Sequence, residues 1–209
     1  IGCPGVIDST HGVCCYANNL YWANLKVVDI VSKELGLPAW MINDANAAML
    51  GEMTFGEHRY KNALLLTLGT GIGGGIFING ELFEGQYGVG AELGHAIIRK
   101  GSYQCTCGMK GCFEAYASAT ALEKEAARRI NKHPESILAN DKINAKAVFD
   151  AHKGGDKLAS SLVRWYVQNL GCGIINYINI FRPEAILLAG GVSKAGDALI
   201  KPLKRYLSK

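Results

Sequence analysis

The chain has 209 residues, of which 49% are hydrophobic and 19% are charged, and its formal net charge is +4. This composition is typical of a globular protein with a sizeable core, and the scattered lysines and arginines give nucleic-acid binding no support from charge. The longest apolar runs are far shorter than a membrane span, and the odd number of cysteines, seven, fits a reducing cytoplasm better than a disulfide framework.

The first part of the chain is expected to hold a short strand and a helix. The strand is expected over residues 1–8. Because the chain opens on Ile-Gly-Cys-Pro-Gly, which is typical of the end of a strand, we expect an N-terminal part to be missing. Residues 25–35 carry apolar side chains at helical spacing, and Gly36 and Pro38 predict where that helix ends.

A polar pair follows the next predicted strand. Residues 39–42 predict a short buried strand and residues 47–55 predict a helix. Asn43 and Asp44 would therefore lie at a strand-to-helix junction, where α/β folds bind ligands. Asp44 has an alternative interpretation as the N-cap of the helix, because aspartate and asparagine are common caps.

A glycine-rich segment joins two further predicted strands, over residues 62–68 and 76–78. The linking residues 69–75 read Gly-Thr-Gly-Ile-Gly-Gly-Gly, and such glycines let backbone N–H groups approach an anion closely. The segment lacks the Gly-Lys-Ser/Thr of a Walker P-loop, and glycine-rich hairpins are often only tight turns. Asn79-Gly80 predicts a two-residue hairpin turn after the second strand.

The rest of the chain is expected to be mainly helical, with one more buried strand over residues 185–189. Helices are expected over residues 113–130, 144–152, 158–181 and 196–207. Gly171 and Gly173 lie inside the third of these helices, where each costs roughly 1 kcal/mol relative to alanine. We therefore expect a close-packing or ligand-binding reason for both glycines.

One histidine and three cysteines are concentrated between the glycine-rich segment and these helices, namely His95, Cys105, Cys107 and Cys112. One nitrogen and three sulfurs suit a closed tetrahedral zinc site. The alternatives are ordinary buried cysteines and a disulfide, which would leave one cysteine over and needs an oxidising compartment.

Two motifs in this stretch resemble those of the ROK family (repressors, open reading frames, sugar kinases). Glu92-Leu-Gly-His95 is similar to the ExGH motif, and Cys105-Thr-Cys-Gly-Met-Lys-Gly-Cys112-Phe-Glu114 is similar to the CxCGxxGCxE motif. The resemblance implies an α/β, actin-like (ribonuclease H-like) sugar-kinase fold with two lobes. It also implies that residues 1–44 are the remainder of an incomplete N-terminal lobe and residues 45–209 the C-terminal lobe, with a zinc loop over residues 95–112.

The resemblance also implies roles for individual residues, beginning with Asp44 as the catalytic base. The residues implied for sugar binding are Asn19, Asn43, Glu92, His95 and Glu114. Those implied for the phosphates and adenosine of ATP, which binds with Mg²⁺, are Gly69, Thr70, Gly71, Gly190 and Gly191. The zinc held by His95, Cys105, Cys107 and Cys112 would be structural, because four protein ligands leave no open position. Without the resemblance, Asn19 would be equally typical of a turn.

The implied activity is ATP-dependent phosphorylation of a hexose at its 6-hydroxyl, as in bacterial glucokinases, with glucose as the expected sugar. N-acetylmannosamine, N-acetylglucosamine or another hexose are alternatives, and the protein is expected to be a cytoplasmic homodimer or homotetramer. The rival function is a ROK repressor that binds a sugar effector and carries an N-terminal DNA-binding domain; a zinc protein without a ligand is a third possibility. The intact Asn43-Asp44 pair and the glycine loop favour the kinase, because such repressors tend to lose the loop. The Asp-x-Gly-Gly-Thr loop that opens these kinases is absent from the 209 residues.

Overall fold

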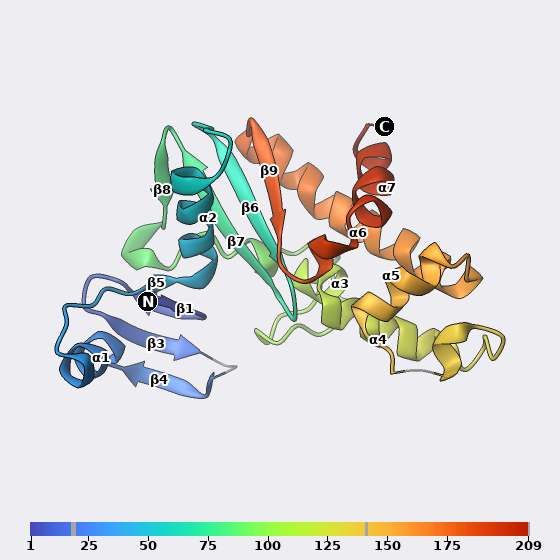
Figure 1. The fold of residues 1–209 in the computed structure, drawn as a ribbon, viewed down its shortest axis with the longest axis horizontal. Coiled ribbons are helices and arrows are strands. Elements are labelled where there is room, and N and C mark those ends of the chain that lie inside the picture. The colour runs from blue at the N-terminus through green and yellow to red at the C-terminus, as the bar shows by residue number, and fades with distance from the viewer. Residues whose placement is uncertain (18–19, 141, 209) are drawn as a thin grey trace. The chain divides into compact units, whose positions relative to one another are not determined.

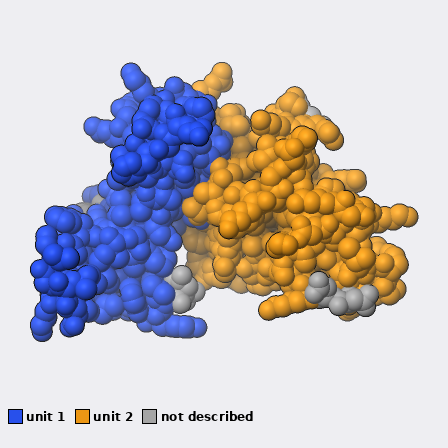
Figure 2. All heavy atoms as spheres, viewed as in Figure 1, with its two compact units in different colours: residues 1–66, 73–92, 183–187 blue, residues 67–72, 93–182, 188–209 orange. Residues whose placement is uncertain are grey.

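The computed structural model describes residues 1–17, 20–140 and 142–208, and the chain divides into two compact units (Figure 2). Unit 1 comprises Ile1–Leu66, Gly73–Glu92 and Pro183–Leu187, and unit 2 comprises Thr67–Ile72, Leu93–Arg182 and Leu188–Lys209. The division into lobes at residue 44 stays a prediction. Among the described helices, none has the length and apolar character needed to cross a membrane.

Unit 1 begins with two small sheets. β1 (Gly2–Cys3) pairs in parallel with β5 (Ile42–Asn43), and β2 (Val6–Asp8), β3 (Val13–Ala17) and β4 (Trp22–Leu25) form an antiparallel sheet in that order. The single strand predicted over residues 1–8 is thus two strands. β3 and β4 were not predicted, because only Cys14 and Ala17 of β3 are buried and β4 has no fully buried residue.

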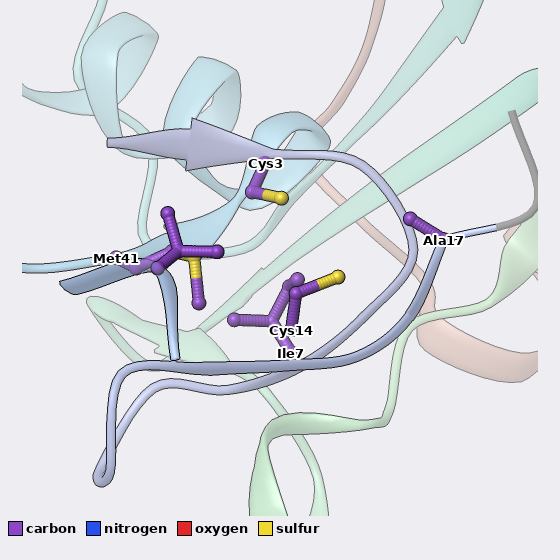
Figure 3. Close-up of a cluster of buried hydrophobic side chains, with 6 residues drawn as sticks. Cys3, Ile7, Cys14, Ala17 and Met41 are labelled. Carbon is purple, nitrogen blue, oxygen red and sulfur yellow. The ribbon is translucent and has the colours of Figure 1, made fainter. Parts of the chain in front are cut away.

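The core of this part of unit 1 is a cluster of small and sulfur-containing side chains (Figure 3). It consists of Cys3, Ile7, Cys14, Ala17, Val27 and Met41. Helix α1 (Val27–Leu35) contributes Val27 and ends, as predicted, at Gly36, whose φ of 64° is the left-handed conformation that glycine tolerates best.

Helix α2 (Asp44–Phe55) follows β5 and starts three residues before its predicted start at residue 47. The helix also lies close to the sheet, because a Cβ atom at Gly75 would collide with Met49. That close approach explains why one of the consecutive glycines at residues 73–75 cannot carry a side chain.

A second sheet has the strand order β8-β7-β6-β9. Its strands are β6 (Ala63–Leu68), β7 (Ile72–Ile78), β8 (Glu81–Phe83) and β9 (Ala185–Ala189). β7 and β8 form the predicted hairpin, with left-handed φ angles of 55° at Asn79 and 84° at Gly80. β7 begins four residues earlier than predicted, so only Gly69, Thr70 and Gly71 separate it from β6.

The helices of unit 2 pack around one long helix, α6 (Lys157–Phe181), which contacts the other four (Figure 1). These are α3 (Glu114–Ala117), α4 (Ala119–Ile130), α5 (Ala145–Lys153) and α7 (Asp197–Leu207). The glycines inside α6 have the expected packing reason, because a Cβ atom at Gly171 would collide with the ring of Tyr206 and one at Gly173 with the ring of Phe113.

The prediction of a single helix over residues 113–130 is wrong, because the structure has two helices there, α3 and α4. Ser118 has extended backbone angles, with φ −84° and ψ 166°, and separates α3 from α4. Its hydroxyl accepts a hydrogen bond of 3.0 Å from the N–H of Ala121, which is the normal function of an N-cap serine. The break leaves α3 as a single short helix that begins at Glu114 and ends at Ala117.

Candidate functional site

The predicted zinc ligands lie together in unit 2. The ligand atoms of His95, Cys105, Cys107 and Cys112 are all within 4.8 Å of one another. Nδ1 of His95 lies 3.6 Å from Sγ of Cys105, and the Sγ atoms of Cys107 and Cys112 are also 3.6 Å apart. Zinc bonds of about 2.3 Å to sulfur and about 2.0–2.1 Å to nitrogen place tetrahedral ligands about 3.6–3.8 Å apart. The four side chains therefore fit a zinc ion.

The two alternatives for these cysteines are not supported, since none of them is disulfide-bonded and Cys107 is exposed, unlike an ordinary core cysteine. All seven cysteines are free thiols, and a separation of 3.6 Å is much longer than the S–S bond of about 2.05 Å. Burial raises the pKa of the Cys112 thiol to about 12 and also raises the pKa of the Cys105 thiol. Buried thiols this close to one another need a cation before they can be held as thiolates at neutral pH.

The loop that carries the cysteines is folded by its own backbone. The N–H of Cys105 donates to the carbonyl of Met109 at 2.9 Å, and the N–H of Gly108 donates to the carbonyl of Cys105 at 3.1 Å. Gly111 has a φ of 92°, and a Cβ atom there would collide with the carbonyl of Arg99. Only glycine fits this position, so the Gly-Cys step of the motif has a local steric reason.

A buried carboxylate that was not predicted anchors the same loop to helix α4. Glu125 is only 2% exposed and accepts a 3.1 Å hydrogen bond from the hydroxyl of Tyr103, whose ring stacks on Tyr116 at 4.9 Å. Glu125 also accepts from Arg128 at 2.7 Å and from Arg129. Burial opposes the charged form of Glu125, but the hydrogen bonds from the two arginines lower its pKa.

Glu114 lies where the cysteine loop meets the glycine loop. Its Oε2 accepts a 2.9 Å hydrogen bond from the N–H of Ile72, the first residue of β7. Its Oε1 accepts a 3.0 Å hydrogen bond from the hydroxyl of Thr106 and lies 3.6 Å from Sγ of Cys105. A Cβ atom at Gly71 would collide with this carboxylate, so a glycine is required beside it.

The glycine loop is held by its carbonyl groups. The carbonyl of Gly69 accepts from the N–H of Ala119, and that of Thr70 accepts from the hydroxyl of Thr120, both at 2.8 Å. Ala119 and Thr120 are the first two residues of α4. In a trans peptide the N–H of the next residue points opposite to the carbonyl. The N–H groups of Thr70 and Gly71 therefore both point away from α4, and such paired donors suit an anion.

The backbone before His95 is also fixed. Glu92 is exposed and precedes a short 3₁₀ helix, η3 (Leu93–His95). The carbonyl of Leu93 accepts a hydrogen bond from the hydroxyl of buried Tyr177, and a Cβ atom at Gly94 would collide with the carbonyl of Ile72. The glycine of the ExGH motif is thus required for packing.

At the start of α2, the helix cap is Asn43 and not Asp44. Oδ1 of Asn43 accepts from the N–H groups of Ala45 and Asn46 at 2.9 and 3.2 Å, and its Nδ2 donates to the carbonyl of Gly5 at 3.2 Å. The interpretation of Asp44 as the cap is therefore wrong. Asp44 is exposed in the first turn of the helix, where the positive end of the helix dipole stabilises a carboxylate.

The turn after β9 contains the two glycines predicted for adenosine binding. Gly190 has a φ of 87°, and a Cβ atom there would collide with the backbone of Leu68. Its carbonyl accepts a 2.8 Å hydrogen bond from the hydroxyl of Ser193. Gly191 leads into a short 3₁₀ helix, η5 (Val192–Ala195). The turn is thus packed against the end of β6, next to the glycine loop.

Of the predicted site residues, unit 2 holds the four zinc ligands, Glu114, and the glycines of both loops. Asn43, Asp44 and Glu92 belong to unit 1, and Asn19 lies outside the described residues. Sequence reasoning did not find Thr106 or Glu125. Thr106 has no local sequence signal, because its partner lies 8 residues away in the chain. Glu125 has Arg128 and Arg129 at helical spacing, but its burial and its bond to Tyr103, 22 residues away, have no such signal.

Comparison with known proteins gives one consistent family. The ROK family model matches residues 1–209. The chain is 42% identical to a glucokinase of Halalkalibacterium halodurans, covering 99% of this chain and 64% of that protein. It is 31% identical to a xylose repressor of Caldicellulosiruptor bescii, covering 100% of this chain and 54% of the repressor. The chain thus spans about two thirds or less of the length of these relatives.

Comparison with solved structures points to the same family. The crystal structure of a ROK family glucokinase from Streptomyces griseus in complex with glucose and AMPPNP superposes with a TM-score of 0.91 at 35% sequence identity. The match covers 100% of this chain and 71% of that protein.

Proposed function

The chain belongs to the ROK family and has the mixed α/β, actin-like fold of its sugar kinases, and we propose that the protein carrying it phosphorylates glucose at the 6-hydroxyl with ATP. The observation that carries the proposal is the Glu114 carboxylate, which is hydrogen-bonded to Ile72 and Thr106. Through these two contacts Glu114 joins the glycine loop, which is suited to binding phosphate, to the cysteine loop, which is suited to binding zinc. The similarity to a glucokinase at 42% identity supports glucose as the sugar.

On the phosphate side, the paired N–H groups of Thr70 and Gly71 would bind phosphate oxygens of ATP. The carbonyls of the same two peptide groups, those of Gly69 and Thr70, already accept hydrogen bonds from α4. The loop therefore needs no rearrangement to present these donors. Mg²⁺ bound with ATP would neutralise part of the phosphate charge. Gly190 and Gly191 would let the adenosine approach the backbone closely, since a larger residue is excluded at Gly190.

On the sugar side, Glu92, His95, Glu114 and Asn43 would bind hydroxyl groups, as would Asn19. Carboxylates and amides suit this task because each offers several hydrogen-bonding sites to neighbouring hydroxyls. The Nδ1 atom of His95 faces the cysteines, so a zinc ion bound there would fix Nε2 as a steady N–H donor. The zinc would shape the pocket without taking part in the reaction.

Asp44 would accept the proton of the 6-hydroxyl as that oxygen attacks the γ-phosphate. One carboxylate oxygen, Oδ1, accepts from the N–H of Ala45 at 2.9 Å, which fixes the orientation of the group. Because Asn43 caps the helix, Asp44 is not needed for that purpose.

The second candidate is a sugar-responsive repressor, which the 31% identity to a xylose repressor favours. Phosphoryl transfer requires a base and a phosphate loop, and a repressor requires neither. The presence of Asp44 and of the Gly69-Thr-Gly71 loop therefore favours the kinase.

A sugar panel with Mg²⁺ and ATP tests the proposal on the full-length protein. ADP release would be followed with glucose, N-acetylmannosamine, N-acetylglucosamine and xylose. Glucose should give the highest kcat/KM, and xylose should give no product of this kind because it has no 6-hydroxyl. Sugar binding without ADP release for every hexose would support the repressor instead.

A further inference from the structure

The residue between the first two cysteines of the motif is placed to orient a sugar-binding carboxylate. Thr106 lies between Cys105 and Cys107, and its hydroxyl donates a 3.0 Å hydrogen bond to Oε1 of Glu114. The same hydroxyl lies 4.0 Å from Sγ of Cys105. Because both neighbours of Thr106 belong to the predicted metal site, its backbone position is set by that site.

The carboxylate of Glu114 needs external partners to hold one orientation. The terminal torsion of a glutamate side chain is broad, so the plane of its carboxylate is not fixed by rotamer preference. Here each oxygen has a donor, Ile72 N–H on Oε2 and the Thr106 hydroxyl on Oε1. A carboxylate has about four acceptor sites. Sγ of Cys105 also lies 3.6 Å from Oε1, so acceptor capacity remains mainly on Oε2 for a sugar hydroxyl.

From this geometry we infer that Thr106 is a positioning residue, which fixes the Glu114 carboxylate for sugar binding and couples it to the zinc loop. The inference rests on the proposed function, in which Glu114 binds sugar. The two donors to Glu114 come from different loops, so removal of the Thr106 hydroxyl leaves the Ile72 contact in place. The loss should therefore affect the sugar and leave ATP binding almost unchanged.

Two substitutions separate the hydroxyl from the rest of the side chain. Thr106→Val keeps the shape and the methyl group but removes the donor, whereas Thr106→Ser keeps the donor and removes the methyl group. A hydrogen bond to a charged group at a partly exposed site predicts about a tenfold weaker Kd for glucose in Thr106→Val. Thr106→Ser should bind within about twofold of the unsubstituted protein, since its donor is retained.

The experiment measures glucose Kd by calorimetry, the KM values for glucose and ATP, kcat, and bound zinc per chain in the full-length protein and both variants. The expected result is a higher Kd and KM for glucose in Thr106→Val only, with kcat, the KM for ATP and the zinc content unchanged. Equal glucose affinity in Thr106→Val and the unsubstituted protein would overturn the inference.

Two other results would also overturn it. Equal weakening in both variants would show that the methyl group matters, and loss of zinc in Thr106→Val would show that the residue acts through the metal site. Failure of the unsubstituted protein to bind or phosphorylate any hexose would instead contradict the proposed function on which the inference depends.

Discussion

The backbone N–H of Ile72 donates a 2.9 Å hydrogen bond to Oε2 of Glu114. The first residue of β7 and the first residue of α3 are thereby joined, although they are 42 positions apart in the chain. The bond brings the glycine loop, which ends at Gly71, against the end of the cysteine loop. Sugar binding and the response to loss of the metal should both depend on this junction.

Replacement of Glu114 by glutamine should weaken sugar binding while the fold is retained. The amide keeps the size of the side chain, but it loses the charge and one of its two acceptor oxygens, so it can no longer accept from both Ile72 and Thr106. Hydrogen bonds to charged groups predict a roughly 10- to 100-fold higher KM for glucose. Glu57→Gln, at an exposed position, is the control, and equal KM values in both variants would show that Glu114 does not bind sugar.

One zinc ion per chain should co-purify with the protein, bound at ~2.3 Å from sulfur and ~2.0–2.1 Å from nitrogen. Cys112→Ala should remove the metal and with it sugar binding, because His95 and Glu114 lose the loop that holds them. Elemental analysis measures the zinc content per chain, and X-ray absorption measures the distances from zinc to sulfur and nitrogen. Cys172→Ala is the matched control, because that cysteine lies in α6 outside the cluster. A protein that binds glucose normally with no metal would contradict this expectation.

Glu125 should stabilise the protein in a pH-dependent way. Burial opposes its charge, but the arginine hydrogen bonds lower its pKa from the ordinary value of 4.5. A lowered folded-state pKa means that the stabilisation is present above about pH 4.5 and is lost as the pH falls through the folded-state pKa.

The measurement is urea unfolding of Glu125→Gln and the unsubstituted protein at several pH values. Loss of the hydrogen bonds from the arginines to the charged carboxylate predicts a loss of about 1.5–3 kcal/mol at pH 7, and the difference should shrink below about pH 4.5. Asp150→Asn removes an exposed pair with Lys146 and should change stability little. A difference for Glu125→Gln that is independent of pH would show that packing, and not charge, is responsible.

Residues close together in the sequence made the cluster of one histidine and three cysteines and the hairpin predictable. His95 and the cysteines lie within one short stretch, and Asn79-Gly80 determines its turn locally. The helix ends were also predictable where glycine was decisive, as at Gly36.

Contacts between distant residues were not predictable in the same way. The hydrogen bonds from Ile72 to Glu114 and from Tyr103 to Glu125 depend on how the cysteine loop folds back on β7 and α4. No local sequence pattern encodes this folding. Ser118 interrupts the helix because its hydroxyl caps α4, yet the apolar spacing around it continues. At the start of α2, two adjacent residues could each act as the cap, and only the structure distinguishes Asn43 from Asp44.

The central claim, that Asp44 is the base of a sugar kinase, is tested most directly by turnover of Asp44→Asn with Mg²⁺, ATP and glucose in the full-length protein. Loss of the proton acceptor predicts that turnover slows by about 10²- to 10⁴-fold, with a near-normal Kd for glucose and melting temperature. Asn43→Ala removes both the helix cap and a proposed sugar ligand, so it should cost about 0.5–2 kcal/mol of stability and also weaken glucose binding, unlike Asp44→Asn. Near-normal turnover of Asp44→Asn at an unchanged melting temperature would contradict the role of Asp44 as the base.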